Sequence, residues 1–460
     1  MNEGAQPMPQ RGKGAKVTKR RELWAILGCI VLLFAFSLAR FAYDVSRLNS
    51  SADDLVSPWT SSKVFVEGKN PYNDAQEFAR ISSAVRDSSP DSCPGEACDL
   101  SQFRMVYPPS VFPIISPLTL LPWRVAVYVY LVGSTVLFVA MLLMLAQKLQ
   151  LPWSNPRKLY MIAFSLALAP LHASIHVSNL NTLVVAFLGI GVIFMRKRPY
   201  LSGIALAISM CLKPQVAFLF FAYPWLRKNW KTAFTGLATC TAILTSSLFW
   251  MRIHHVEWFR GYLGLVIKPY LVSAPNVSSI QRTAVPYFYN PDPIRYLSTN
   301  LQVLIFQFTH SPHYSNVISW TLFLLLAAVA AFLIHSRVSE KYEAIDIAII
   351  SVLTLLPVYQ NFYTAAILIF VVYWAIQNWP LKRAKASLLL MLPLLLPFVA
   401  MTRGAPSLAG FVERHHLSSY FFWNAFIMPH VVWIELFLVF ILLSAARGKD
   451  SPHLPCTEPV

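Results

Sequence analysis

Two neighbouring acidic residues, Asp53 and Asp54, follow the first long apolar run of the chain, and a third acid, Asp44, lies where that run ends. A carboxylate in such a place is ionised at neutral pH, and partial burial beside lipid and a second acid makes it more basic. It can then act as a general base that removes a proton from an attacking hydroxyl. The alternative is that the paired acids only solvate a loop or cap a helix N-terminus after the sequence NSSA.

The composition of the chain defines the elements that must position these acids. Of 460 residues, 56% are hydrophobic and only 13% are charged, and the mean hydropathy is +0.51. Such a chain has too few charges to coat a soluble domain. Runs such as 132–146 and 320–334 are apolar on every side, which indicates helices surrounded by lipid or protein. We therefore predict an all-α polytopic membrane protein. The composition allows roughly ten or more spans, and the positions of the basic clusters favour about twelve transmembrane helices.

The basic residues predict the orientation. The formal net charge is +17, but Lys and Arg occur as short clusters between apolar runs and form no continuous patch, which argues against nucleic-acid binding. Cytoplasmic loops are enriched in Lys and Arg. We expect cytoplasmic tails at 1–23 and 447–460 and a membrane domain at 24–446 in the inner (plasma) membrane, with long outer, periplasmic loops at about 44–107 and 251–315.

Cys93 and Cys98 lie in the first predicted outer loop, with a Pro-Gly pair between them. In an oxidising exterior this spacing favours a disulfide. Free thiols are the alternative. A metal site is disfavoured because no His lies nearby and one Cys pair does not complete a zinc site.

Four apolar runs in the middle of the chain are shorter than a membrane span. They cover 159–171, 180–195, 201–212 and 216–226. A run of about 11 to 16 residues cannot cross a hydrocarbon core about 30 Å thick, so we predict short helices packed inside the bundle, or hairpins. Their polar tips carry Asn179, Asn181 and Lys213. Lys213 is either a phosphate ligand or a lysine that reaches to the membrane interface.

The Pro-rich segment 103–123 joins the first outer loop to the second span. Its prolines exclude one continuous helix, and its aromatic and apolar residues suit short helices in the membrane interface. Such a segment offers a surface for a lipid chain. The alternative is a loop that caps the bundle.

Several segments, taken in order, resemble glycosyltransferase family 87. They are VFVEGKNPY, VYPPSVFPIISPLTLLP, SNLNTLVVAFLGIG, LSGIALAISMCLKPQVAFLF with RKNWK, and APNVSSIQR, and with the preceding acid they extend from Asp54 to Arg282. The resemblance implies a GT-C-like bundle with long outer loops. It also implies transfer of a sugar, typically mannose, from a polyprenyl-phosphate carrier to a glycolipid or glycan acceptor among the membrane lipids, with inversion.

The resemblance also implies roles for individual residues. Asp54 corresponds to the acid assigned to catalysis, with Asp53 as its neighbour and Asp44 as the fallback base. Apart from the resemblance, a leaving phosphate needs cationic or hydrogen-bonding partners near the outer leaflet. The candidates are Arg282, supported by Asn276, Ser279 and Gln281, and, more weakly, Lys213, Arg104 and Lys268. The alternative for Arg282 is an outer-loop arginine that is only solvated. Residues expected to contact sugar or acceptor are Tyr107, Trp59, Asn179 and Asn181. For Tyr107 and Trp59 the alternative is the aromatic belt of a membrane interface. No cofactor is required, because the donor carries its own leaving group, and no acid cluster beyond Asp53 and Asp54 supports a divalent ion.

The chain departs from the family pattern in two places. Ser178 to Asn181 stand where the family commonly has Gly-Gln-x-Asn, and LLPVYQNFYTA stands where a His pair is common. Two other functions stay open. One is another lipid-linked glycan transferase or ligase, and the other is a transporter with a site between broken helices. The absence of two similar halves favours an enzyme.

Overall fold

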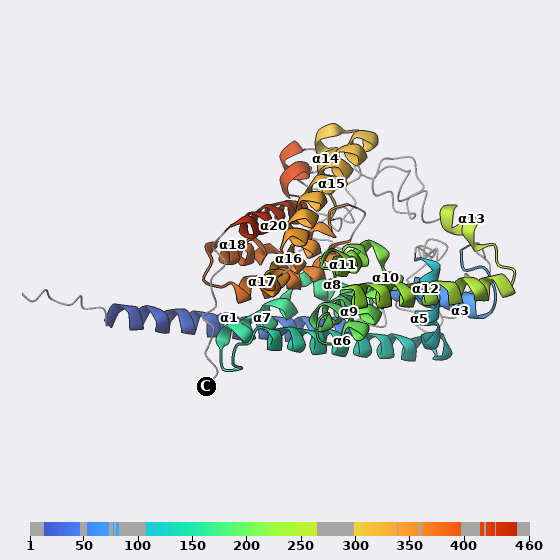
Figure 1. Ribbon diagram of the computed structural model, residues 1–460, viewed down its shortest axis with the longest axis horizontal. Coiled ribbons are helices and arrows are strands. Elements are labelled where there is room, and N and C mark those ends of the chain that lie inside the picture. Colours follow the sequence, from blue (N-terminus) through green and yellow to red (C-terminus); the bar gives the residue numbers. More distant parts are fainter. Residues whose placement is uncertain are drawn as a thin grey trace, which may run out of the picture.

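The computed structural model of the chain is built from helices (Figure 1). It describes residues 13–46, 53–72, 77, 80–81, 107–264, 299–337, 339–357, 361–396, 415–417, 420–427 and 429–448. No β-strand occurs among these residues. The predicted all-α class is therefore confirmed for the described part of the chain.

Five of the described helices are long and apolar enough to cross a membrane. They are α1 (Lys13–Ser46), α6 (Trp123–Lys148), α12 (Trp230–Ile253), α15 (Pro312–Ser336) and α20 (His430–Arg447). Helices α7 (Pro156–Ala167) and α8 (Ala169–His176) meet at a bend of 46° and make a sixth span if they are counted together. By helix length, the described residues thus give five or six spans, and the predicted number of about twelve is not confirmed.

Helix α6 shows how such a span is arranged. Val125, Val129, Val132 and Val136 are about half exposed and recur at the spacing of one helical face. The opposite face of α6 is buried against α9 (Asn181–Phe194). Exposed valines in a continuous stripe are costly in water and favourable against lipid tails, so α6 presents one face to lipid and the other to the protein.

Three of the four short runs predicted in the middle of the chain form single short helices, whereas the run 159–171 lies in α7 and the start of α8, the bent pair that is long enough to span when counted together. Helices α9, α10 (Pro199–Leu212) and α11 (Pro214–Leu226) follow one another and pack together, and α10 also packs along α12. The α10–α12 contact is so close at Gly203 that a Cβ there would lie 2.7 Å from the Thr232 carbonyl oxygen. Small residues allow helices to approach this closely inside membranes.

The C-terminal third supplies the other half of the core. Every residue of α16 (Glu343–Leu353) is buried, as are Ile369 to Ile376 of α17 (Ile369–Gln377). The 3₁₀ helix η8 (Phe362–Leu368) precedes α17 and packs against α8. Helix α18 (Lys382–Leu390) packs on α17 and α20. A helix that is buried on all sides belongs inside a bundle. The two acids of α16, Glu343 and Asp346, are paired there with basic residues.

Short elements gather at one end of the molecule, drawn at the right of Figure 1. They are α3 (Asp53–Val66), the succession of 3₁₀ and α turns η3 (Pro109–Val111), α5 (Phe112–Ile115) and η4 (Ser116–Leu120), and α13 (Trp258–Tyr262). These turns confirm the short helices predicted for 103–123. The predicted outer loops are thus partly helical, and 251–315 also includes α14 (Leu301–Thr309) and the start of α15.

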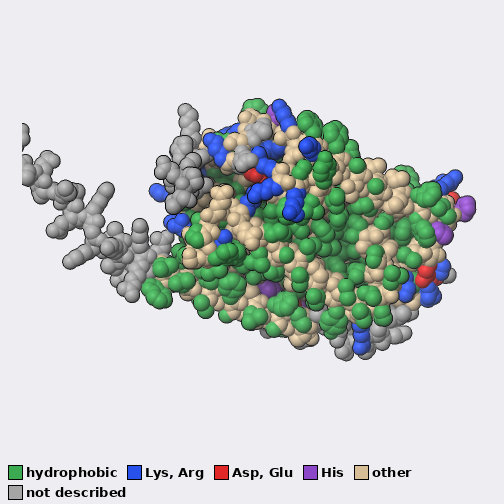
Figure 2. Space-filling view, turned by 60° about the horizontal axis from the view of Figure 1, so that its bottom comes forward, with side chains coloured by type: hydrophobic (Ala, Val, Ile, Leu, Met, Phe, Trp, Pro, Cys, Tyr) green, Lys and Arg blue, Asp and Glu red, His purple; other side chains and the backbone are tan. Residues whose placement is uncertain are grey.

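The surface of the molecule has an apolar middle and charged groups toward its ends. In the space-filling view, hydrophobic side chains cover the middle of the face drawn, whereas Lys and Arg gather in one group left of centre and again at the right-hand end (Figure 2). An apolar middle between charged ends is the distribution that a bilayer requires. It agrees with the membrane location predicted from the composition.

Candidate active site

Asp54 lies in the first turn of α3 and is half-buried. Its backbone N–H donates to the Val177 carbonyl oxygen at 3.1 Å, which joins α3 to the end of α8. Its Oδ2 accepts a hydrogen bond of 2.9 Å from the side-chain amide of Asn179. Among the described residues none donates to Oδ1, so one oxygen of this carboxylate is left for another group. Asp53 begins α3 beside it.

Asn179 is the centre of the site. It follows Ser178, whose left-handed backbone (φ 51°) turns the chain sharply between α8 and α9. Its backbone oxygen accepts from the Tyr130 hydroxyl at 2.7 Å, and its Oδ1 accepts from the Asn181 backbone N–H at 2.8 Å. With both ends of its amide engaged, Asn179 holds one orientation, in which the NH₂ group faces Asp54.

Lys213 separates α10 from α11 and is only 5% exposed. Its ammonium lies 3.5 Å from Asn179 Oδ1 and 4.9 Å from the centre of the Tyr363 ring. Asn179 thus contacts both this ammonium and the Asp54 carboxylate. A buried lysine beside lipid needs such partners, because an isolated ammonium is expensive there.

Tyr363 brings the C-terminal third of the chain into the site. Its backbone oxygen accepts from the Asn181 side-chain amide at 2.9 Å, and its hydroxyl accepts from the Asn361 amide at 2.7 Å. The structure therefore brings together Asp54, Asn179, Asn181 and Lys213, which the sequence assigned separately. Tyr363 is the member to which the sequence assigned no role, although it lies in LLPVYQNFYTA, the segment that departs from the family pattern.

The third acid, Asp44, has different surroundings. Its side chain is fully buried among Arg40 at 3.6 Å, His172 at 3.3 Å and His176 at 3.2 Å. The second ring nitrogen of His172 contacts the Leu166 carbonyl oxygen at 2.8 Å. A carbonyl can only accept, so that nitrogen carries the hydrogen of this bond and the other ring nitrogen faces Asp44. These partners tie α1 to α8.

Trp59 and Tyr107 lie beside this region but are both buried. The Trp59 ring is 3% exposed, packs edge-on against Trp123 at 5.3 Å and donates to the Leu118 carbonyl oxygen. Tyr107 is 8% exposed, and its backbone oxygen accepts from the Tyr72 hydroxyl. Little of either ring is left for a sugar, so their predicted stacking role needs a movement of the chain.

The segment after α3 is fixed to its neighbours. Asn70 donates to the Glu257 carbonyl oxygen at 3.0 Å. Gly68 has φ +73°, and a Cβ there would lie 2.5 Å from the His254 ring, so the position requires glycine. The guanidinium of Arg80 and the ammonium of Lys69 lower the pKa of Glu77 to about 2, so this carboxylate is charged at neutral pH.

Several predicted residues lie outside the described residues. They are the phosphate-binding candidates Arg104, Lys268, Asn276, Ser279, Gln281 and Arg282, and the cysteines Cys93 and Cys98. Within the described ranges, no group of three or more His, Cys, Asp and Glu side chains is arranged to hold a metal ion. The chemistry that the described residues offer is that of a carboxylate next to a buried cation.

The chain was also compared with known proteins. The model of glycosyltransferase family 87 matches residues 105–358, which is more than half of the chain. The match includes Asn179, Asn181 and Lys213 and begins after Asp54. No curated protein and no solved structure matches the chain. The matched segment contains the turn between α8 and α9 and the junction of α10 with α11. The chain therefore belongs to glycosyltransferase family 87 and is a membrane enzyme that transfers glycosyl groups.

Proposed function

We propose that this enzyme transfers a sugar, most simply mannose, from a polyprenyl-phosphate carrier to a hydroxyl of a glycolipid or glycan acceptor. Asp54 is the general base of this reaction. The observation that carries the proposal is the contact between a half-exposed carboxylate, the amide of Asn179 and the buried ammonium of Lys213. Asp44 is less suited to this role because its side chain is fully buried among Arg40, His172 and His176.

The proposed reaction is a single displacement. Oδ1 of Asp54 takes the proton of the acceptor hydroxyl while the hydroxyl oxygen attacks the anomeric carbon. The bond between that carbon and the phosphate oxygen breaks, and its electron pair leaves with the polyprenyl phosphate. Attack from the side opposite the leaving group inverts the anomeric centre. Asn179 holds the carboxylate toward the acceptor, and Lys213 stabilises the negative charge of the phosphate.

We further propose that this site faces the periplasm or exterior. Tyr130, which contacts Asn179, and Lys148 lie about 27 Å apart along α6 at about 1.5 Å per residue. This separation is close to the thickness of a bilayer core. Lys148, Arg196 and Arg227 cluster at the far end, which the positive-inside rule assigns to the cytoplasm.

The test is sugar transfer by the full-length protein in nanodiscs, supplied with polyprenyl-phosphate-mannose and a membrane-lipid extract. Asp54→Asn keeps an acceptor for the Asn179 amide but cannot take a proton, so we expect kcat to fall by about 100- to 10,000-fold. Asp53→Asn is the matched control and is expected to retain most activity. Loss in Asp53→Asn alone would move the base by one residue. Transfer from other polyprenyl-phosphate sugars but not from the mannose donor would correct the sugar.

A further inference from the structure

A second site lies at the end of the bundle opposite Asp54. It is a cavity of about 440 Å³ between the last turns of α9 and α11 and the first turns of α12 and α16. This volume lies within the range of about 300–1,000 Å³ that is common for ligand sites. Its lining residues are Met195, Arg196, Tyr223, Arg227, Lys228, Asn229, Trp230, Lys231 and Glu343.

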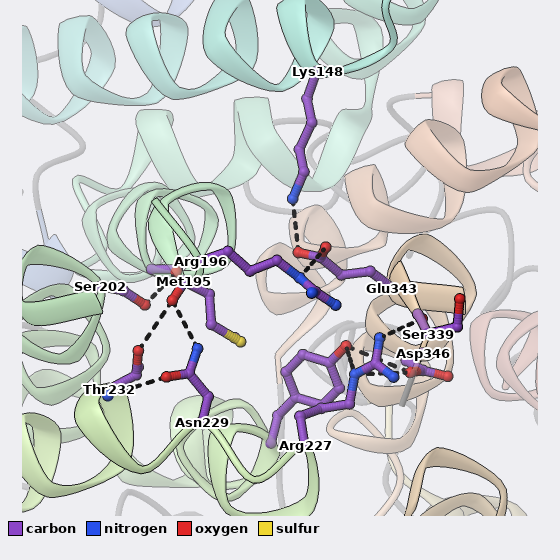
Figure 3. A network of polar contacts seen from close by, with 12 residues as sticks. Lys148, Met195, Arg196, Ser202, Arg227, Asn229, Thr232, Ser339, Glu343 and Asp346 are labelled. Atoms are coloured by element: carbon purple, nitrogen blue, oxygen red, sulfur yellow. Dashed lines mark hydrogen bonds and ion pairs between the residues drawn. The ribbon is translucent and has the colours of Figure 1, made fainter. Parts of the chain in front are cut away.

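The charge of this cavity is positive. Four of its lining residues are basic, and Glu343 is the single acid. That acid is already paired, with the Lys148 ammonium at 2.7 Å and the Arg196 guanidinium at 3.7 Å (Figure 3). Lys228 and Lys231 are exposed, and no described carboxylate pairs with either of them. An anion in the cavity would therefore meet two ammonium groups without displacing an existing ion pair.

The wall of the cavity is held in place by buried polar contacts. Arg227 is only 7% exposed. Its guanidinium lies 3.6 Å from the Asp346 carboxylate and donates to the Ser339 carbonyl oxygen at 3.0 Å. Asn229 donates to the Met195 carbonyl oxygen at 2.7 Å and joins α12 to α9 (Figure 3). The basic residues thus project from a fixed frame, and a ligand would find the site largely preformed.

The rim of the cavity continues into a lipid-facing surface. Trp230 lines the cavity, is 51% exposed, and packs against Phe234, which is 57% exposed, and against Trp225. Leu237 extends this exposed apolar face along α12. Tryptophans gather at the level of lipid headgroups. A molecule in the cavity would therefore have its charged part among the lysines and an apolar part along α12.

We propose that this cavity binds the phosphate headgroup of an anionic membrane lipid in the leaflet opposite the Asp54 site. Basic pockets between transmembrane helices on the cytoplasmic side are suited to such headgroups. Lys228 and Lys231 are the residues that contact the phosphate, and Trp230 lies against the lipid. The site is separate from the glycosyl-transfer site and does not depend on the role proposed for Asp54.

The test measures lipid binding to the purified full-length protein by native mass spectrometry in detergent. The probes are phosphatidylglycerol, phosphatidylcholine and inorganic phosphate. The double variant Lys228→Gln/Lys231→Gln removes the two free charges, and Lys197→Gln/Lys382→Gln removes two exposed lysines that do not line the cavity. We expect the first pair to weaken phosphatidylglycerol binding by about 25-fold and the second pair to leave it within about twofold.

Three results would overturn the proposal. Equal losses in the two double variants would mean that net charge, and not this cavity, attracts the lipid. Equal binding of phosphatidylcholine would remove the role of the lysines. If inorganic phosphate binds as tightly as phosphatidylglycerol, and if Lys228→Gln/Lys231→Gln abolishes that phosphate binding, the cavity would be assigned to a soluble phosphate compound. The single variant Lys231→Gln, in the exposed first turn of α12, is expected to lose about fivefold and checks the double variant for misfolding.

Discussion

The Asn179 side chain both donates to the proposed base Asp54 and accepts from the buried Asn181 N–H, so the effect of removing it on stability can be calculated from these two hydrogen bonds. In Asn179→Ala, the Asp54 carboxylate loses the donor at 2.9 Å, and a hydrogen bond to a charged group contributes about 1.5–3 kcal/mol. The buried Asn181 N–H loses its acceptor at 2.8 Å, and an unsatisfied buried donor costs about 1–3 kcal/mol. Together we expect a loss of about 3–5 kcal/mol in the free energy of unfolding.

This loss can be measured by denaturation in mixed detergent micelles, followed by tryptophan fluorescence. Asn378→Ala is the matched control, because Asn378 makes one local bond, to the Trp374 carbonyl oxygen at 2.9 Å, and should cost about 1 kcal/mol. If the two alanine variants unfold at the same denaturant concentration, and if Asn179→Ala transfers sugar at the wild-type rate, Asn179 neither organises the site nor positions Asp54.

A second substitution separates the positioning role from stability. Asn179→Asp keeps an oxygen for the Asn181 N–H and for Lys213, but it places a second carboxylate against Asp54. Two carboxylates at this distance favour a proton shared between them. We therefore expect the acid limb of the pH–rate profile to move to higher pH, with a smaller loss of stability than in the alanine variant. An unchanged profile would mean that Asp54 does not act as the base.

Two further predictions concern the packing of the bundle. Arg227→Met leaves the buried Asp346 carboxylate without its cation at 3.6 Å and should lower the free energy of unfolding by about 3 kcal/mol. In a double-mutant cycle, Arg227→Met combined with Asp346→Leu should recover most of that loss. A double variant no more stable than the single one would contradict this. Gly203→Ala places a Cβ 2.7 Å from the Thr232 carbonyl oxygen and should cost about 1–3 kcal/mol, but Gly133→Ala, with nothing within 4 Å, should gain about 0.5–1 kcal/mol. Equal melting temperatures for these two variants would show that α10 and α12 are not in close contact.

The sequence predicted those parts of the fold that depend on local composition. Apolar runs without alternation indicated helices, and the short runs between 159 and 226 lie in α7 to α11. Helices this short are marginal on their own, so packing inside the bundle stabilises them. The number of spans was harder to predict. An apolar run does not say whether its helix crosses the membrane or lies inside the bundle, and α9 and α16 are buried almost throughout.

The candidate site was predicted in its residue types but not in its connections. The polar tips around Asn179 and Lys213 stood out because polar residues interrupt apolar sequence, and the structure brings both tips to one place. Contacts across long sequence separations have no local signature. For that reason the enclosure of Asp44 by His172 and His176, and the entry of Tyr363 into the site, could be seen only in the folded chain.

The helices that separate the two ends of the bundle also connect them. Helix α9 runs from Asn181 in the Asp54 site toward Met195 at the basic cavity, and α11 runs from Lys213 to Arg227. Each is about 20 Å long at about 1.5 Å per residue, less than the usual bilayer core. Either polar site therefore lies at least partly below the level of the headgroups, or the bilayer is thin around α9 to α11. In both cases a lipid whose charged head reaches one of these sites must come closer to the bundle interior than a lipid beside α6, whose valine stripe offers it no polar contact.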